Sequence, residues 1–352
     1  MKEAYQSFLK EISSFIPKER VFTDDLRCLA WGTDASFYRL IPKIVIMSKD
    51  EEEVSKLLTL ANARQLPVTF RAAGTSLSGQ SLSDSILIVA GKNWEQYEIA
   101  PDHNSIRMQP GIIGERVNEI LRPYQRIFTP DPASKKSAMV GGIVVNNASG
   151  MNCGTHANSD KVLLSARIVL ADGTVLDTGN EESRQVFRKS HPDFVRKIEE
   201  LRDEINADPE LVERIRYKYS IKNVTGLNIL PFVTFTDPFD IICHLMVGSE
   251  GTLAFLSEVT MGTGHLYPHS ASAMLYFKDI KEACRAVVAM KKGPVFSAEL
   301  LDEKSLSSVN DTTGTGLTAV LTETKGDTKE ELLANIATVK KILEPFDLFK
   351  PA

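Results

Sequence analysis

The sequence predicts an α+β fold of two domains, or of one large domain with an appendage, and three observations support this prediction. Residues 43–71 contain a strand, a helix and a second strand, which must form a parallel pair with a right-handed crossover. Residues 165–179 place two strands around Asp172-Gly173, a strong signal for an antiparallel hairpin. Strand–helix alternation resumes near residue 268, and the 352 residues are about twice the length of an ordinary domain.

Composition and charge exclude several classes of protein. With 43% hydrophobic and 25% charged residues, the chain has the balance of an ordinary globular protein. Its net charge of −5, with no basic stripe, argues against a nucleic-acid partner. No apolar run reaches the length that spans a bilayer, so we expect at most peripheral membrane association.

The cysteines form neither a disulfide framework nor a metal pattern. Cys28, Cys153, Cys243 and Cys284 are scattered without CxxC pairs, and the six histidines show no ligand spacing. We therefore expect no metal site in this chain and a reducing, cytoplasmic location.

The first part of the chain is predicted to be a helical segment followed by an α/β region. Residues 1–37 begin with an amphipathic helix that places Phe8, Ile12, Phe15 and Ile16 on one face. The next elements are expected to be a strand at 43–47, a helix at 51–64, strands at 67–71 and 86–90, and two strands with a helix at 114–121 within residues 95–128.

The second part begins with a segment of small residues and ends with a separate domain. After the hairpin, residues 181–220 are predicted to be a helical insertion, and GSEGT (248–252) a buried turn in the sheet. The last elements are expected to be strand, helix, strand, helix over 270–306, a strand at 317–324 and a helix at 327–345. This order is typical of a ferredoxin-like domain. Because no closing strand follows, we expect that domain to be partial.

The segment RAAGTSLSGQ (71–80) is the first candidate binding site. A strand that ends in a glycine-rich loop exposes several backbone N–H groups, and such a nest suits a pyrophosphate. Gly74 and Gly79 permit positive φ or close approach, while Thr75 and Ser76 add hydroxyl donors. The alternative, a flexible turn without a ligand, stays open from these residues alone.

Two further segments carry candidate residues. PDPASKKSAMVGGIVVNNASGMNCG (130–154) concentrates glycines and small residues, as a wide planar ligand lying against main chain would require. Its paired amides, Asn146 and Asn147, are equally consistent with caps that hold a loop together. Glu250 stands between two glycines in an apolar setting, where a buried carboxylate must be hydrogen-bonded to backbone amides or to a ligand.

Taken in order, these segments resemble the vanillyl-alcohol oxidase / p-cresol methylhydroxylase family of flavoproteins. Within it they are most similar to the D-lactate dehydrogenase and glycolate oxidase group. The matching stretches span residues 33–262 and are TDASFYRLIPKIVIMSKDEEEV, RAAGTSLSGQ, PDPASKKSAMVGGIVVNNASGMNCG and HLMVGSEGTLAFLSEV. Four motifs in the same order are far more specific than any one of them.

This resemblance implies a domain organisation and a set of cofactor residues. A two-subdomain FAD-binding domain of the PCMH type would occupy residues 38–265, with subdomains 38–95 and 96–265, and a partial cap domain would occupy 268–352. The implied FAD-binding residues are Arg71, Ala73, Gly74, Thr75, Ser76, Gly79, Gln80, Pro130, Asp131, Ser134, Met139, Gly141, Gly142, Asn146, Asn147, Ser149, Gly150, Gly154, Glu250 and Gly251.

The resemblance also implies an activity. Such a protein would oxidise a small D-2-hydroxy acid such as D-lactate or glycolate, and pass electrons to an iron–sulfur domain, a quinone or an electron-transfer protein rather than to NAD. FAD would be non-covalent, because Thr75 stands where relatives with covalent flavin carry histidine.

Residues 215–232 resemble the long members of the family, in which a flavoprotein half is fused to an iron–sulfur half. We therefore expect this chain to be an N-terminal part, with 4Fe–4S clusters and the catalytic residues beyond residue 352. Three alternatives stay open: a non-catalytic FAD-binding electron-relay subunit, a flavin reductase of the same fold, and an α/β protein whose glycine loops are only turns.

Overall fold

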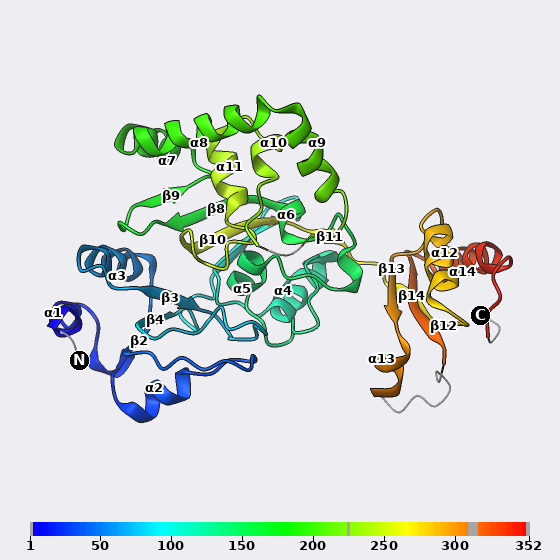
Figure 1. The fold of residues 1–352 in the computed structure, drawn as a ribbon, viewed down its shortest axis with the longest axis horizontal. Helices are drawn as coiled ribbons and strands as arrows, with labels where there is room; N and C mark the ends of the chain where they lie inside the picture. Colours follow the sequence, from blue (N-terminus) through cyan, green and yellow to red (C-terminus); the bar gives the residue numbers. More distant parts are fainter. Residues whose placement is uncertain (1–2, 224–225, 309–315, 350–352) are drawn as a thin grey trace. The chain divides into compact units, whose positions relative to one another are not determined.

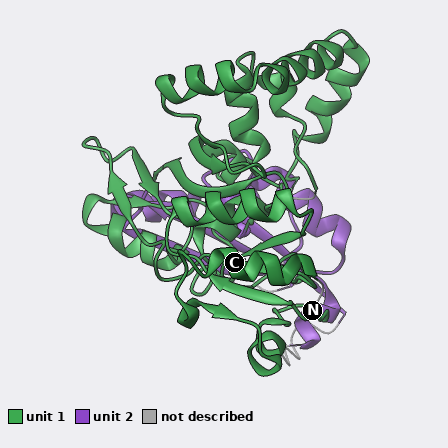
Figure 2. Ribbon diagram, turned by 90° about the vertical axis from the view of Figure 1, so that its left-hand side faces the viewer, with its two compact units in different colours: residues 1–149, 155–264 green, residues 150–154, 265–352 purple. Residues whose placement is uncertain are grey.

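The chain folds into two compact units (Figure 1). The computed structural model describes residues 3–223, 226–308 and 316–349. Unit 1 comprises residues 1–149 and 155–264, and unit 2 comprises residues 150–154 and 265–352, shown in two colours in Figure 2. Mixed helix and sheet in both units confirms the predicted α+β class.

The first sheet of unit 1 has the strand order β1-β2-β4-β3. Its strands are β1 (Val21–Phe22), β2 (Ile44–Met47), β3 (Val68–Arg71) and β4 (Ile86–Val89). Both β2 and β3 run parallel to β4, which lies between them. The parallel arrangement is confirmed, but the predicted direct pairing of β2 with β3 is wrong. All four residues of β4 are buried, and the most apolar strand takes the central position.

Three helices accompany this sheet, together with the short turn η1 (Lys18–Arg20). They are α1 (Glu3–Ile12), α2 (Asp25–Trp31) and α3 (Glu51–Ala63). The side chain of Asp50 caps α3 by accepting the backbone N–H of Glu53. One face of α3, with Val54 and Leu57, packs in the same apolar cluster as β2, β4 and the buried Phe8 of α1. The helices predicted at the N-terminus and at 51–64 are confirmed by α1 and α3.

The second sheet of unit 1 is antiparallel, with the strand order β5-β6-β10-β8-β9. Its strands are β5 (Tyr97–Ile99), β6 (Ser105–Met108), β8 (Leu163–Val169), β9 (Val175–Asp177) and β10 (Phe255–Gly262). The hairpin that joins β8 to β9 turns at Asp172-Gly173, where Gly173 has φ +89°. The predicted hairpin is therefore confirmed.

Short elements connect the two sheets and pack beneath the second one. They are α4 (Gly114–Leu121), η2 (Arg122–Tyr124), β7 (Arg126–Ile127), α5 (Val140–Asn146), α6 (Ser159–Val162) and, at the end of unit 1, β11 (Gly264–His265). The helix predicted at 114–121 is confirmed. The helix α5 was not predicted, because its two glycines are poor helix formers. It forms because Ile143 and Val144 are buried in the core of the second sheet.

The insertion after β9 is helical, as predicted. It contains α7 (Glu181–Ser190), α8 (Pro192–Asn206) and α9 (Pro209–Lys218), followed by α10 (Pro231–Thr234) and α11 (Pro238–Leu245). Each of the last four helices starts with a proline, which supplies a helical φ where no N–H is needed.

The predicted turn at 248–252 needs one correction. It joins the helix α11 to the strand β10, whereas the sequence predicted a turn within the sheet. The segment before the turn is helical because the side chain of Asp237 caps it and Phe239, Ile242 and Cys243 are buried in the core.

Unit 2 contains an antiparallel sheet of order β12-β14-β13. Its elements are η3 (Met151–Cys153), β12 (His269–Phe277), α12 (Ile280–Met290), β13 (Ser297–Leu301), α13 (Glu303–Ser308), β14 (Thr318–Gly326) and α14 (Lys329–Leu343). Leu275, Phe277 and Val320 of the sheet form a core with α12 and α14. The predicted order of strand and helix is confirmed.

The described part of the chain contains neither a membrane-spanning helix nor a cluster of metal ligands. The longest helices there, α8 and α14, have 15 residues each, and no helix is both long and apolar enough to cross a bilayer. In the same residues, no group of three or more His, Cys, Asp or Glu side chains could hold a metal ion. All four cysteines are free thiols.

Candidate functional site

A cavity of about 420 Å³ lies within unit 1, and three chain segments line it. They are the loop that follows β3, the segment from residue 132 through α5 to 149, and the turn that leads into β10. Its volume falls in the range of small-molecule and cofactor sites. The predicted residues that line it are Arg71, Ala73, Gly74, Thr75, Ser76, Gln80, Ser134, Met139, Gly141, Gly142, Asn146, Ser149, Glu250 and Gly251.

The loop after β3 is shaped by two glycines with positive φ. Gly74 has φ +71°, and a Cβ there would lie 2.5 Å from the Arg71 guanidinium. Gly79 has φ +80°, and a Cβ there would lie 3.1 Å from the ring of Tyr38. In the described residues, the backbone N–H groups of 73–77 have no protein acceptor. These free donors at one end of the cavity fit an anionic group.

Arg71 reinforces the positive character of this loop. Its side chain is only 9% exposed, and Nη1 donates to the carbonyl oxygens of Thr33 (2.8 Å) and Trp31 (3.3 Å). Its buried Nε has no hydrogen-bond partner among the described residues. Burial lowers the pKa of Arg71, although a guanidinium remains charged at any physiological pH. An unpartnered cationic donor beside free N–H groups fits the pyrophosphate of a dinucleotide cofactor.

The second wall of the cavity is formed by α5. A Cβ on Gly141 would lie 2.5 Å from the Cβ of Pro110, so only glycine permits this packing. Gly142 faces Ala72 across the cavity, where a Cβ would be 3.6 Å from the Ala72 Cβ. Small residues therefore leave the main chain accessible, as a wide flat ligand requires.

Apolar side chains form another part of the cavity lining. Phe70 of β3 and Phe255 of β10 line it, with ring centroids 4.9 Å apart. Ala254, directly before β10, and Leu256 of β10 also line it. The cavity thus combines anion-binding donors in one part with an apolar surface in another. These two features fit the pyrophosphate and the flat ring system of FAD.

Glu250 belongs to the third wall and has an unusual conformation. Its φ is +55°, a left-handed value that costs energy for a residue other than glycine. Its N–H donates to the carbonyl of Val145 (3.0 Å), and its Oε1 accepts a hydrogen bond from Nδ2 of Asn146 (2.7 Å). Burial raises the pKa of Glu250, while hydrogen bonds from Asn146 and Gln80 lower it in part.

Several predicted residues do not line the cavity. Asn147 turns away from it, with φ +53°, and its side chain pairs with Asp160 at the start of α6. It therefore has the capping role that the sequence left open. Gly79 lies behind the loop against Tyr38. The others outside the lining are Pro130, Asp131, Gly150 and Gly154, of which the last two belong to unit 2.

Sequence reasoning missed the apolar part of the site. Phe70, Pro110 and Phe255 were not predicted as site residues, although Phe70 lies in the strand predicted at 67–71 and Phe255 comes shortly after the turn predicted at 248–252. The sequence did contain a signal for Phe255. The alternating strand begins shortly after GSEGT, and the first residues of a strand that follows a cavity-lining turn lie at the edge of that cavity.

Fold and cavity define the class of a dinucleotide-binding flavoprotein domain, and comparison with known families agrees. Residues 42–179 match the model described as "FAD binding domain". Residues 266–348 match "FAD linked oxidases, C-terminal domain". The chain belongs to the PCMH-type family of FAD-linked oxidases, and the resemblance to this family is confirmed.

The curated relatives are named as dehydrogenases or oxidases of 2-hydroxy acids. The chain is 24% identical over 316 residues to a D-2-hydroxyglutarate dehydrogenase of Haemophilus influenzae, which covers 81% of this chain and 30% of the relative. It is 29% identical over 178 residues to a glycolate oxidase subunit of Escherichia coli, covering 50% and 36%. A mitochondrial D-lactate dehydrogenase [cytochrome] of Arabidopsis thaliana is 25% identical over 328 residues, covering 90% and 48%.

Solved structures share the fold. An alkyldihydroxyacetonephosphate synthase superposes with a TM-score of 0.68 at 15% identity, covering 98% of this chain and 60% of that chain. This similarity concerns the fold alone. The chain spans about 30% of the length of the D-2-hydroxyglutarate dehydrogenases it matches.

Proposed function

We propose that this chain is the flavin-binding part of a dehydrogenase that oxidises a small D-2-hydroxy acid to the 2-oxo acid. The observation that carries the proposal is the cavity of unit 1, which places the free N–H groups of 73–77 and an apolar surface around Phe255 in one site. The names of the curated relatives, which are dehydrogenases and oxidases of 2-hydroxy acids, support the substrate class.

FAD would be held by residues of all three walls. The N–H groups of 73–77 and the hydroxyls of Thr75 and Ser76 would bind the pyrophosphate, with Arg71 supplying positive charge. The main chain at Gly141 and Gly142, with Phe255, would contact the wider part of the cofactor. We propose that the attachment is non-covalent, with Thr75 at the position where relatives with covalent flavin carry histidine.

The domain limits are part of the same proposal. The FAD-binding domain would occupy 38–265, with its helical insertion at 181–220, and a cap that contributes to substrate binding would begin at 268. The chemistry that bound FAD would supply is acceptance of a hydride equivalent from the α-carbon of the hydroxy acid. The role of the described cavity residues is to bind and orient the cofactor and to exclude water around the apolar wall.

Electrons would leave to an acceptor other than NAD. We propose an iron–sulfur domain, a quinone or an electron-transfer protein, and any 4Fe–4S clusters would belong to a part outside this chain. The length of the D-2-hydroxyglutarate dehydrogenase relatives, of which this chain matches about 30%, leaves room for such a part.

The test is a visible spectrum of the purified chain after incubation with FAD and desalting. Retained flavin bands are the expected result, and bleaching on anaerobic addition of D-lactate, glycolate or D-2-hydroxyglutarate but not of L-lactate would identify a working dehydrogenase. Flavin that stays oxidised with every acid would point to catalytic residues outside this chain or to the electron-relay subunit. Bleaching by NADPH alone would favour a flavin reductase, and absence of flavin would contradict the proposal.

A further inference from the structure

Glu250 occupies a position in which one carboxylate meets two walls of the cavity. Its Oε1 accepts from Nδ2 of Asn146 in α5, 2.7 Å away. The side chain of Gln80, at the end of the loop after β3, lines the same cavity and lowers the pKa of this carboxyl as a hydrogen-bond donor. Asn146 belongs to the part of unit 1 built on the second sheet, whereas Gln80 follows a strand of the first sheet. One side chain therefore connects the two halves across the cavity.

The direction of these hydrogen bonds requires an acceptor at Glu250. The hydroxyl of Ser76 donates to Oε1 of Gln80, which leaves the amide NH₂ of Gln80 to face Glu250. Asn146 also offers its NH₂. An ionised carboxylate accepts from both amides, because it has two oxygens and no proton. Through Gln80 and Ser76, the carboxylate is thus linked to the hydroxyl that would face the pyrophosphate.

The backbone is strained to place this side chain. Glu250 has φ +55°, between Gly248 at +86° and Gly251 at +75°. Gly248 must be glycine, because a Cβ there would lie 2.7 Å from the carbonyl oxygen of Gly226. A non-glycine residue kept in this conformation, half-buried and with a carboxylate in an apolar setting, indicates that its side chain has a task.

We infer that Glu250 is a positioning residue, a tie that holds the loop 72–81 and α5 at the separation that FAD requires. The inference rests on the proposed function for its effect on FAD, but the tie itself is a property of the cofactor-free protein. What matters is the reach of the side chain to Gln80 and Asn146, so shortening it is more damaging than removing its charge.

The experiment compares Glu250→Asp, which keeps the charge and loses reach, with Glu250→Gln, which keeps reach and loses charge. In Glu250→Gln the amide can still accept from Asn146, and a flip of Gln80 restores the second hydrogen bond. FAD titration of the full chain, followed by flavin fluorescence, is expected to show a loss on the order of tenfold for Glu250→Asp and less than about threefold for Glu250→Gln. The exposed Glu95, changed to Asp, is the matched control.

A double-variant cycle separates the tie from general damage. Gln80→Ala should weaken FAD binding in the wild-type background, but it should add nothing in a Glu250→Ala background, because the partner is already lost. Circular dichroism and melting of the cofactor-free variants report whether they fold. Additive losses, a Glu250→Asp variant with wild-type affinity, or equal losses in Glu250→Asp and Glu250→Gln would overturn the inference.

Amide hydrogen exchange of the cofactor-free protein tests the tie without FAD. Residues 72–81 should exchange faster in Glu250→Asp than in wild type or Glu95→Asp, and unchanged exchange would overturn the inference. If the wild-type chain binds no FAD while this exchange difference is present, the proposed function fails and the tie stands.

Discussion

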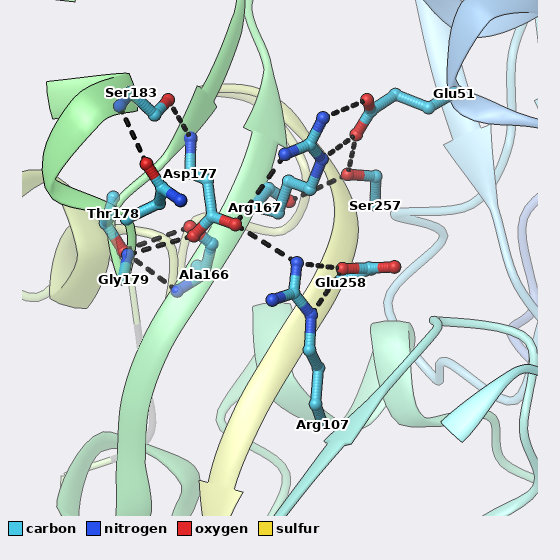
Figure 3. A network of polar contacts seen from close by, with 11 residues as sticks. Glu51, Arg107, Ala166, Arg167, Asp177, Thr178, Gly179, Ser183, Ser257 and Glu258 are labelled. Carbon is cyan, nitrogen blue, oxygen red and sulfur yellow. Dashed lines mark hydrogen bonds and ion pairs between the residues drawn. The ribbon is translucent and has the colours of Figure 1, made fainter. Parts of the chain in front are cut away.

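Arg167 of β8 and Glu51 at the start of α3 form a two-pronged ion pair, in which Nε and Nη2 donate to the two carboxylate oxygens at 2.8 Å each (Figure 3). Ser257 of β10 also donates to Glu51, at 2.6 Å. The pair joins the helix of the first sheet to the second sheet. Asp177 extends it, lying 3.6 Å from Arg167 and 3.0 Å from Arg107 (Figure 3).

This network predicts that Arg167→Met destabilises unit 1. The variant removes the cation that Glu51 and Asp177 share, so Glu51 loses its ion pair while Asp177 keeps only Arg107. We expect the free energy of unfolding to fall by about 1–2 kcal/mol, less than for a fully buried pair because the Arg167 side chain is 34% exposed. Urea unfolding measures it. The exposed Arg196, which pairs with Glu200, provides the control, since Arg196→Met should cost much less than Arg167→Met. Equal effects would contradict the role of the network.

The conformation of Gly74 predicts that Gly74→Val abolishes FAD binding. The β-branched side chain is strained at φ +71° and would displace the Arg71 guanidinium from its two carbonyl partners. We expect the dissociation constant for FAD to rise at least about tenfold. Gly91→Ala is the control, because its Cβ meets nothing closer than 3.9 Å and lies outside the cavity lining. Normal affinity in Gly74→Val would contradict the assignment of this loop.

The local part of this site could be predicted from sequence. A strand that ends in RAAGTSLSGQ exposes backbone donors whatever surrounds it, so the loop 71–80 was found as a candidate. Its neighbour α5 could not be found in the same way, because Gly141 and Gly142 oppose a helix locally and burial of Ile143 and Val144 decides the outcome.

The sequence could not predict which way a side chain points or which residue it contacts. The adjacent amides Asn146 and Asn147 look alike in the sequence, yet one faces the cavity and the other pairs with Asp160. The difference is made by the helix end, where Asn147 takes φ +53°. Similarly, Phe70 and Phe255 meet only because two separate sheets bring their strand ends together.

The chemistry of Thr75 predicts that the flavin is released by acid. A threonine hydroxyl does not form the flavin linkage that the resemblance assigns to histidine at this position. After precipitation of the FAD-loaded protein with trichloroacetic acid, the yellow flavin should remain in the supernatant. Flavin fluorescence that stays with the washed pellet, or with the denatured band on a gel, would contradict non-covalent attachment.

The burial of the cysteines predicts that one of the four thiols reacts in the folded protein. Cys284 is exposed on α12, whereas Cys28, Cys153 and Cys243 are buried. Burial raises the pKa of Cys243 to about 12, so almost none of it is thiolate at pH 8. Titration with a thiol reagent should give about one fast equivalent in buffer and all four in denaturant. Cys284→Ser should remove the fast equivalent, and a second fast thiol in that variant would contradict the predicted burial.

The burial of Glu250 predicts a pH dependence of stability with a definite sign. Desolvation raises the pKa of this carboxyl above its ordinary value of 4.5, so the folded protein binds the proton more tightly than the unfolded chain. The stabilisation from this group is therefore fully present below about pH 4.5 and is lost as the pH rises through the folded-state pKa. The side chain in Glu250→Gln does not titrate, so the variant lacks this pH-dependent contribution to the free energy of unfolding.

Urea unfolding of the cofactor-free protein and of Glu250→Gln between pH 4 and pH 8 isolates the effect, because every other titrating group is shared by the two proteins. The free energy of unfolding of wild type, relative to the variant, should decrease as the pH rises. Glu95→Gln, at an exposed position, is the control for removing a carboxylate elsewhere on the chain. If the relative stability of wild type instead increases with pH, the hydrogen bonds from Asn146 and Gln80 outweigh the desolvation of the carboxylate in the cofactor-free protein.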